Sequence, residues 1–305
     1  MSEVIYSLRI FFVQNFNFTF IFLLSQRLPI MNLLRRLYYT LSPELRLKAR
    51  EIYYKPSDLV QKMTQKKGEI IPPKGMIFTG SGDFLSSGKR YINIFEKHGG
   101  LKSTHHVLDI GSGIGRMAIP LMSFLDKTAQ YEGFDVMKMG VNWCQKNITT
   151  LYPNFKFTHV SLKNDLYTND GNEAESFTFP YSDNQFDFCF LTSVFTHMTD
   201  KQVENYLEEI QRVLKPGGRC LATFFILNKI AKHDSNQEFQ FPYDYAHYRL
   251  MDDKVKSANV AYQQSYLEAF ANKVNLRIKD IHFGYWSHQR KEEALDFQDI
   301  VVFEK

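Results

Sequence analysis

A glycine-rich turn behind an acid is the feature of this chain that points most directly to chemistry. The run VLDIGSGIGR, residues 107–116, joins an apolar stretch containing Asp109 to three closely spaced glycines. Glycine allows a tight turn and lets the backbone approach a ligand where a Cβ would collide. The pattern therefore predicts a ligand-binding loop built on Gly111, Gly113 and Gly115.

A second acid indicates that the ligand contains a nucleoside. Asp135 closes the apolar run YEGFD, twenty-six residues after Asp109, and an acid there can accept hydrogen bonds from both hydroxyls of a ribose. The glycine spacing is GxGxG, whereas the dinucleotide fingerprint is GxGxxG, and the Lys and Ser/Thr of a P-loop are missing. The spacing therefore disfavours NAD and nucleoside triphosphates, although the two acids alone would suit NAD equally.

The elements that must position these residues alternate along the chain. Short apolar runs alternate with amphipathic helical patterns, which predicts a doubly wound α/β fold with a mostly parallel, seven-stranded sheet. No helical pattern separates the last two runs, so one strand must reverse and form an antiparallel hairpin at the sheet edge. The strands are predicted at 106–110, 130–134, 156–160, 186–191, 219–226, 277–283 and 298–304.

Capping residues indicate where the main helices lie. Ser42 and Pro43 predict the start of a helix that runs to about residue 54, with Pro56 in the link beyond it. Another helix is predicted over 86–98. Thr199 and Gln202 fit the capping box of a third helix, which LKPGG and its Pro216 would end; its predicted buried stripe is Val203, Tyr206, Leu207, Ile210 and Val213.

Two further runs extend the glycine motif into the pattern of a known family. FPYSDNQFDFCFLTSVFTHM, residues 179–198, carries a PxxDNxFD run into the predicted fourth strand, and LKPGG closes a helix before the fifth. Together with the acidic glycine loop and Asp135, residues 107–225 resemble the class I S-adenosylmethionine-dependent methyltransferases. The resemblance implies a Rossmann-like fold, methyl transfer as the activity and S-adenosylmethionine as the cofactor.

The same resemblance implies roles for individual residues. Asp109 would steady the methionine end of the cofactor, Gly111 and Gly113 would admit its backbone, and Asp135 would bind the ribose. Such proteins often carry an acid after the third strand, near the adenine amine, but Ser161 and then Leu162 stand there in this chain, so backbone and apolar contacts would hold the adenine. The further predicted cofactor contacts are Ser112, Gly115, Val136 and Thr192.

Structural interpretations of these residues stay open. Asp109 could cap the glycine turn, Asp135 could cap the following helix, and the glycines could serve strand-helix packing alone. His197, in SVFTHM after the fourth strand, could act as a general base on an acceptor hydroxyl or amine, or it could only hydrogen-bond its loop. The histidines show no metal-ligand spacing, so no metal is expected.

Two segments are candidates for binding the acceptor substrate. TGSGDF, residues 79–84, ends in Phe84, and FQFPYDYAHY, residues 239–248, includes Tyr243 and Tyr245. The odd-numbered aromatics from 239 to 245 would line one face of an extended segment, because Pro242 blocks a helix there. This face could close over a substrate; the alternative is a loop that covers the core.

The N-terminal region differs from the rest in composition. We expect a leader at 1–30, a basic helical extension at 31–74 and the main domain at 75–305. The apolar run at 10–24 is shorter than the about 20 residues that span a bilayer, and no signal-peptide cleavage site follows it. A translation start at Met31, an interfacial anchor and a packed helix are all compatible with the leader.

Charge and cysteine content limit which partners and which cellular setting are expected. The net charge is +4, and residues 31–70 hold nine Lys or Arg against four acids, which leaves residues 71–305 nearly neutral. No nucleic acid is therefore expected, whereas the N-terminal 55 residues could contact a membrane peripherally, or be simply solvated. Three cysteines without a CxxC pair fit a reducing, cytoplasmic setting.

These observations favour methyl transfer from S-adenosylmethionine to a small metabolite, a sugar or a lipid-linked intermediate. A binding or scaffold protein that keeps the fold without turnover stays open, as does an NAD(P)-dependent oxidoreductase. The sequence leaves the acceptor, the methylated atom and the oligomeric state undetermined.

Overall fold

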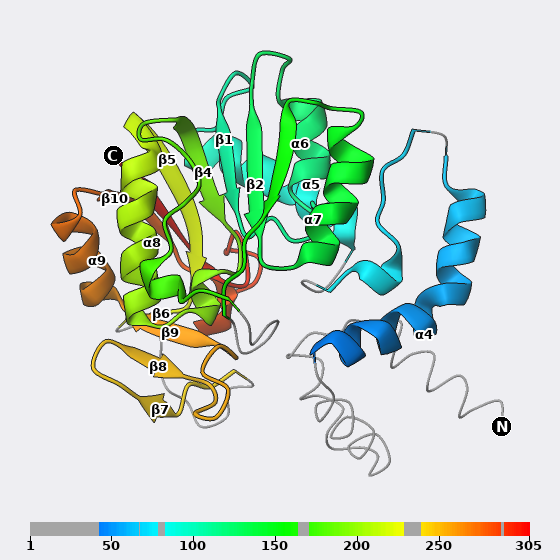
Figure 1. Cartoon of the computed structure of the whole chain (residues 1–305). Helices are drawn as coiled ribbons and strands as arrows, with labels where there is room; N and C mark the ends of the chain where they lie inside the picture. Colours follow the sequence, from blue (N-terminus) through cyan, green and yellow to red (C-terminus); the bar gives the residue numbers. More distant parts are fainter. Residues whose placement is uncertain (1–42, 67, 79–82, 164–170, 229–238, 288–289) are drawn as a thin grey trace, which may run out of the picture.

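The structure is a computed structural model that describes residues 43–66, 68–78, 83–163, 171–228, 239–287 and 290–305. The predicted leader and residues 79–82 of the TGSGDF segment lie outside these ranges. A seven-stranded sheet forms the centre of the molecule, in the order β10-β11-β5-β4-β1-β2-β3 (Figure 1). Its strands are β1 Val107–Ile110, β2 Tyr131–Asp135, β3 Phe155–His159, β4 Phe186–Leu191, β5 Leu214–Phe224, β10 Arg277–His282 and β11 Asp299–Glu304.

The strand directions confirm the predicted sheet. Strands β1 to β5 pair in parallel, and β11 runs antiparallel to both β5 and β10. Because β11 is inserted between β5 and β10, its first residue, Asp299, lies beside Phe224 at the carboxyl end of β5. The predicted antiparallel edge hairpin is therefore present, with β10 as the outer strand.

Helices cover both faces of the sheet and bury two apolar cores. On one face, α8 Asp200–Val213 and α9 Gln264–Lys273 pack on the first core. On the other face lie α5 Phe84–Ile94, α6 Ala118–Phe124 and α7 Lys138–Cys144. Successive residues of a strand point to opposite faces, so Leu108 belongs to the first core and Val107 to the second. Asp109 points to the same face as Val107.

Helix α8 has the predicted start and the predicted buried face. The capping box of Thr199 and Gln202 is present, and the stripe from Val203 to Val213 is buried. The end differs from the prediction, because the helix stops at Val213, before Pro216, and LKPGG forms the first part of β5. Gly217 there has a φ of 78° and donates its N–H to the carbonyl of Lys305, so the motif joins the sheet instead of ending the helix.

The N-terminal helix is longer than predicted. Helix α4 runs over Pro43–Thr64 and contains Pro56, which the sequence placed in a link. A proline inside a helix costs about 3 kcal/mol, but tertiary contacts beyond it stabilise the last turns. The Asp58 carboxylate accepts the backbone N–H groups of Lys74, at 2.7 Å, and Gly75, at 3.1 Å. These contacts fold residues 68–76 back along the helix.

A second, four-stranded sheet at the carboxyl edge was not predicted. Its order is β6-β9-β8-β7, formed by β6 Ile226–Leu227, β9 Val260–Gln263, β8 Tyr248–Leu250 and β7 Tyr243–Asp244. The aromatic stretch at residues 239–248 leads into this sheet. Its alternation predicted that the odd-numbered aromatic residues would share one face, but they do not. Phe241 is 2% exposed, whereas Tyr243 is 41% exposed. The chain changes role at β7, because Phe239 and Phe241 pack on Phe225 while Tyr243 starts a hairpin.

Candidate functional site

The glycine loop lies at the carboxyl edge of the sheet, between β1 and β2. The N–H groups of Gly111 and Ser112 both donate to the carbonyl of Phe134, at 2.9 and 3.0 Å. The φ angles of Gly111, Gly113 and Gly115 are 83°, 57° and 81°, a region that side chains rarely adopt. A Cβ on Gly111 would also lie 2.5 Å from Cγ2 of Val194. The loop therefore requires its glycines for its own conformation.

Asp109 is a buried acid directly beneath this loop. One carboxylate oxygen accepts the hydroxyl of Tyr131 at 2.5 Å. Burial raises the pKa of Asp109 to about 8, the Tyr131 hydrogen bond lowers it in part, and the charge of nearby Asp135 raises it further. Near neutral pH the carboxyl is mostly protonated, and a cationic group placed beside it would favour its ionisation.

Asp135 joins the loop to the end of β2. Its Oδ2 accepts the N–H of Gly113 and its Oδ1 that of Met137, each at 2.7 Å. Burial raises its pKa, and these backbone hydrogen bonds act in the opposite direction. Asp135 therefore fixes the glycine loop and the residue before α7, which is close to the structural interpretation that it caps the following helix. Each carboxylate oxygen can accept a further bond, so this geometry also fits ribose hydroxyls.

The other predicted cofactor contacts occupy the same edge with different exposure. The side-chain oxygen of Ser112 is buried and, among the described residues, has no hydrogen-bond partner. Val136 packs against the first core, and Thr192 follows β4 and is half-buried. After β3, Ser161 is exposed, while Leu162 is buried and forms an isolated bridge with Asn172.

His197 lies in the short helix η5 Phe195–His197, which follows β4. Its Nδ1 is 2.8 Å from the carbonyl oxygen of Ser257. Burial lowers the pKa of His197, although hydrogen bonds to backbone carbonyls act in the opposite direction. The imidazole is thus neutral at pH 7, and Nδ1–H donates to Ser257, which leaves Nε2 as an acceptor. The side chain of His197 therefore bonds a segment 60 residues away along the chain, and its role as a base stays a prediction.

The predicted substrate residues differ in their surroundings. Phe84 is buried in the first turn of α5, with the guanidinium carbon of Arg116 5.3 Å from the centre of its ring. Tyr245 stacks on Tyr248 with ring centres 4.9 Å apart. The carboxylate of Asp109 bonds Tyr131 instead. Asp109, beneath the glycine loop, therefore has different neighbours from Tyr243 and Tyr245, the tyrosines predicted to contact the substrate.

A buried acid on β11 escaped the sequence analysis. Asp299 accepts the N–H groups of Ile226, at 2.6 Å, and Gly284, at 2.7 Å, and the indole N–H of Trp286, at 2.7 Å. Burial raises its pKa to about 7, although the three donors act in the opposite direction. Trp286 packs with Phe225 in an aromatic cluster. No local motif indicates Asp299, because its partners lie up to 73 residues away.

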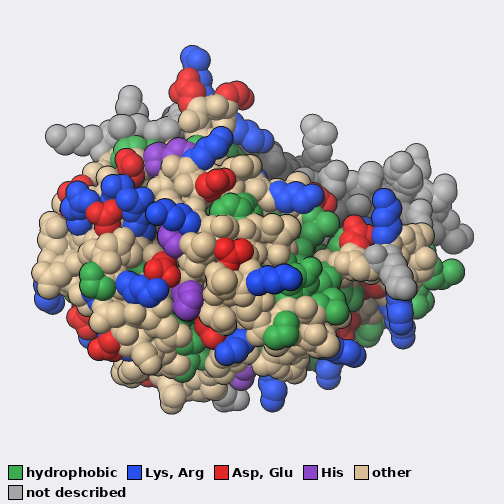
Figure 2. All heavy atoms as spheres, turned by 90° about the horizontal axis from the view of Figure 1, so that it is seen from above, with side chains coloured by type: hydrophobic (Ala, Val, Ile, Leu, Met, Phe, Trp, Pro, Cys, Tyr) green, Lys and Arg blue, Asp and Glu red, His purple; other side chains and the backbone are tan. Residues whose placement is uncertain are grey.

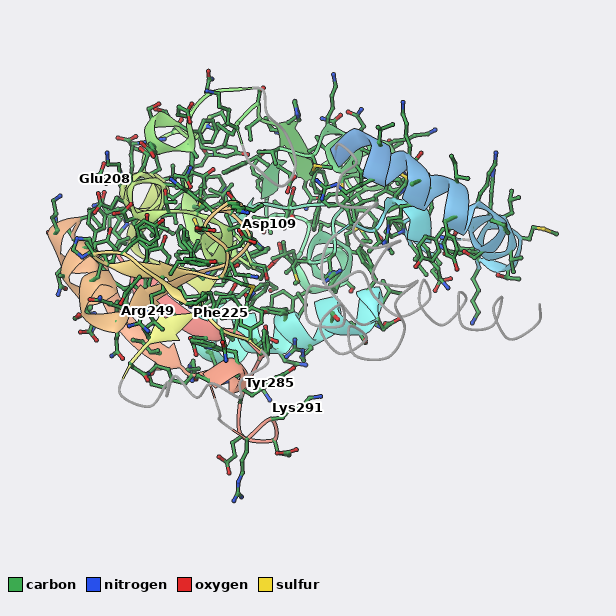
Figure 3. The ribbon with its side chains drawn as sticks, turned by 90° about the horizontal axis from the view of Figure 1, so that it is seen from below. Asp109, Glu208, Phe225, Arg249, Tyr285 and Lys291 are labelled. Atoms are coloured by element: carbon green, nitrogen blue, oxygen red, sulfur yellow. The ribbon has the colours of Figure 1, made fainter. Side chains whose placement is uncertain are left out.

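At the carboxyl edge of the main sheet, different elements lie on the two sides of the candidate site. Figure 3 shows Asp109 near the middle of this edge, with the small sheet on one side of it and α4 on the other. Among the residues that the structure describes, no group of three or more His, Cys, Asp or Glu side chains could hold a metal ion. The described helices also include none that is long and apolar enough to cross a membrane.

The comparisons with known proteins agree with this geometry. Residues 108–222 match the sequence model of a family described as a methyltransferase domain. Over 126 residues the chain is 27% identical to the ubiquinone/menaquinone biosynthesis C-methyltransferase UbiE of Pseudoalteromonas translucida, a match that covers 41% of this chain and 45% of that protein. The chain thus matches less than half the length of this relative.

Solved structures with a similar arrangement include two methyltransferases of low sequence identity. One is a putative sarcosine dimethylglycine methyltransferase from Galdieria sulphuraria, 16% identical, with a TM-score of 0.48 over 72% of this chain and 86% of that one. The other is a Burkholderia thailandensis 1,6-didemethyltoxoflavin-N1-methyltransferase with bound S-adenosylhomocysteine, 14% identical, with a TM-score of 0.46 over 72% and 79%.

Over residues 108–222 the chain is therefore similar to class I methyltransferases, and the residues of the matching motifs lie together at the carboxyl edge of the sheet. S-adenosylmethionine is the cofactor of this class, and the glycine loop, Asp109 and Asp135 have the chemistry to hold it.

Proposed function

We propose that the whole protein transfers a methyl group from S-adenosylmethionine to a small-molecule acceptor. The observation that carries the proposal is the glycine loop held between two buried acids, with Gly113 donating to Asp135 at 2.7 Å. Bound there, S-adenosylmethionine would supply a methyl group attached to a sulfonium. After the transfer the rest of the cofactor is a neutral thioether, so its departure needs no acid catalysis. The protein's own contribution is therefore mainly binding, orientation and exclusion of water.

Each acid has a separate part in this proposal. Asp135 binds the ribose through the free acceptor positions of its carboxylate, and its two backbone hydrogen bonds fix the orientation of that carboxylate. Asp109 faces the methionine end, where a cationic amine or sulfonium favours its ionised form. Ser112, Gly115, Val136, Ser161, Leu162 and Thr192 complete the proposed cofactor contacts.

His197 is the proposed base for an acceptor that must lose a proton. Its bond to Ser257 fixes one tautomer, and its lowered pKa keeps the other nitrogen available near neutral pH. An acceptor that is already nucleophilic would not need this residue, so loss of His197 distinguishes the two cases.

The proposed acceptor is a small metabolite, a sugar or a lipid-linked intermediate. The nearly neutral main domain supports this choice over nucleic acid. Figure 2, which views the opposite edge of the sheet, shows basic and acidic side chains interspersed. Lys215 and Asp187 form one of the ion pairs of the main domain. Phe84, Tyr243 and Tyr245 are proposed to contact the acceptor, in a cytoplasmic protein.

A two-stage experiment tests the function. Calorimetry with S-adenosylmethionine, S-adenosylhomocysteine and NAD first determines which cofactor binds; binding of NAD alone would reject the proposal. A metabolite extract is then incubated with the protein and S-adenosylmethionine carrying an isotopically labelled methyl group, and labelled products are identified by mass spectrometry. Cofactor binding without any labelled product from varied extracts would favour a non-catalytic binding protein.

A further inference from the structure

Helix α4 has one covered half and one exposed half. The covered half contacts the segment that follows the helix: the guanidinium of Arg50 donates to the carbonyl of Lys74, and the side-chain amide of Gln61 donates to the carbonyl of Pro72. Tyr54, on the same half, is buried. The chain itself thus occupies this half, which includes part of the basic face expected from the sequence.

The exposed half carries an apolar stripe along its centre. Leu45, Ile52 and Leu59 recur every seven residues, and Met63 follows one turn later, so they lie above one another on the helix. Ile52 is 73% exposed and Met63 is 86% exposed. Apolar side chains of this size are not usually left in water along a whole helix. Figure 2 shows hydrophobic side chains beside basic and acidic ones on the lobe that contains α4.

A row of lysines runs beside the stripe with the same spacing. Lys48, Lys55 and Lys62 also recur every seven residues and are exposed. Long lysine side chains can lay their methylene groups along an apolar surface while the ammonium group reaches toward an anionic one. An apolar stripe flanked by lysines is the pattern of a helix that lies in the interface of a membrane with anionic lipid.

The same pattern disfavours a second copy of the chain as the partner. Antiparallel pairing of two α4 helices would set the lysine row against itself. Parallel pairing would set it against the opposite flank, Arg46, Tyr53 and Val60, which carries no negative charge. Pro56 also lies in the stripe, where it interrupts the regular seam that a coiled coil needs, whereas a fluid lipid surface accepts an irregular helix.

We propose that the exposed half of α4 docks the protein on an anionic lipid surface. The stripe enters the interfacial region and the lysine row contacts the lipid headgroups. Figure 1 shows α4 at the side of the domain, with its first turns level with the carboxyl edge of the main sheet. Docking would therefore hold the protein at the membrane without a spanning helix. This inference does not depend on the proposed methyl transfer.

Vesicle co-sedimentation of the full-length protein tests the inference. Phosphatidylcholine vesicles are compared with vesicles that contain about a quarter phosphatidylglycerol, at low and high salt, because screening weakens contacts between charges. One variant combines Ile52→Gln and Leu59→Gln, and a second replaces Lys48, Lys55 and Lys62 by Gln. The matched control is Leu151→Gln, because Leu151 is 62% exposed, much like Leu59 at 57%, but lies far from α4 in the sequence.

The expected results are specific to the surface. The unaltered protein binds the anionic vesicles, salt weakens that binding, and each α4 variant binds them at least about tenfold more weakly. Leu151→Gln binds like the unaltered protein, and all variants keep its melting temperature. Absence of vesicle binding, or equal binding by the α4 variants, overturns the proposal. So does light scattering that shows a dimer which only the stripe variant dissociates, since a second copy would then occupy the stripe.

Discussion

The carboxyl edge of the main sheet holds two buried aspartates that are assembled in different ways. Asp135 receives its hydrogen bonds from Gly113 and Met137, which lie within 22 residues of it. Asp299 receives its three from Ile226, Gly284 and Trp286, across as many as 73 residues. The first belongs to the proposed cofactor loop, whereas the second ties the aromatic cluster to the sheet. Asp135 is thus held by residues near it in the sequence, whereas Asp299 forms a joint between segments that are distant in the sequence.

The joint at Asp299 has a clear mechanical role. It connects the start of β6, the short helix before β11 and β11 itself, and it fixes the indole of Trp286. Trp286 packs on Phe225 with ring centres 5.2 Å apart and on Phe241 at 5.6 Å. Loss of the carboxylate should therefore loosen this side of the edge and leave the cofactor loop intact.

The largest expected effect is that of Asp299→Ala on stability. The change leaves three buried donors without an acceptor, each costing about 1 to 3 kcal/mol, so the free energy of unfolding should fall by at least about 3 kcal/mol. Urea denaturation at pH 7 measures it, and calorimetry on the folded protein should give nearly unchanged cofactor affinity. A fall below about 1 kcal/mol would show that water or other groups satisfy these donors.

Asp135→Ala should have the opposite profile. Cofactor binding should weaken by about 1 to 3 kcal/mol, the range for losing a charge-assisted acceptor. Two N–H groups lose their acceptor here instead of three, so the fall in stability should be smaller than for Asp299→Ala. Calorimetry well below the melting temperature isolates the affinity. Unchanged affinity would remove Asp135 from the site and leave it a purely structural cap.

The contrast between the two aspartates also explains what the sequence could predict. The glycine turn from Asp109 to Gly115, the seven strands and the α8 stripe depend on residues close together in the chain, and the structure contains all three. The ligand-binding role of the turn stays a prediction. The end of α4 was predicted wrongly because Asp58 stabilises the helix beyond Pro56 through residues 16 and 17 positions later. The small sheet was missed because strands of two to four residues leave no periodic signal.

The sequence supported the predicted cofactor contacts better than the predicted substrate contacts. The pairing of Asp135 with the loop follows from the parallel order of β1 and β2, which the alternating pattern predicts. The orientation of Tyr243 and Tyr245 depends on a hairpin whose partner, β9, comes from residues 260–263. Alternation along residues 239–245 therefore could not show that the chain turns from core to surface at β7.

Asp109 provides a pH test of the buried cofactor side. Its pKa in the folded protein is about 8, against about 3.9 in an unfolded chain, so between these values the folded protein binds more protons. The free energy of unfolding must therefore fall as the pH rises from about 4 to 8. Asp109→Asn removes this contribution while keeping an oxygen for Tyr131, and should reduce the fall between pH 5 and 8 by up to about 4 kcal/mol.

Urea denaturation at several pH values between 5 and 9 measures this difference. Asp299, with a pKa of about 7, contributes a fall of the same sign up to that pH and remains in the variant, so some slope should persist. Identical pH profiles for the two proteins would show that Asp109 is already ionised in the folded state.

The smallest stability effect is expected for the exposed tyrosines on the other side of the edge. Tyr243→Ala combined with Tyr245→Ala removes side chains that are 41% and 39% exposed, together with the stacking of Tyr245 on Tyr248. The free energy of unfolding should change by less than about 1 kcal/mol. Turnover of the acceptor found in the extract screen should fall, with cofactor affinity unchanged, if these rings contact the acceptor. Phe241→Ala is the matched comparison, since truncating its buried ring should cost about 3 to 5 kcal/mol. A similar cost for the tyrosine pair would place both in the core and reject a substrate role, whereas unchanged turnover with unchanged stability would leave β7 a surface hairpin only.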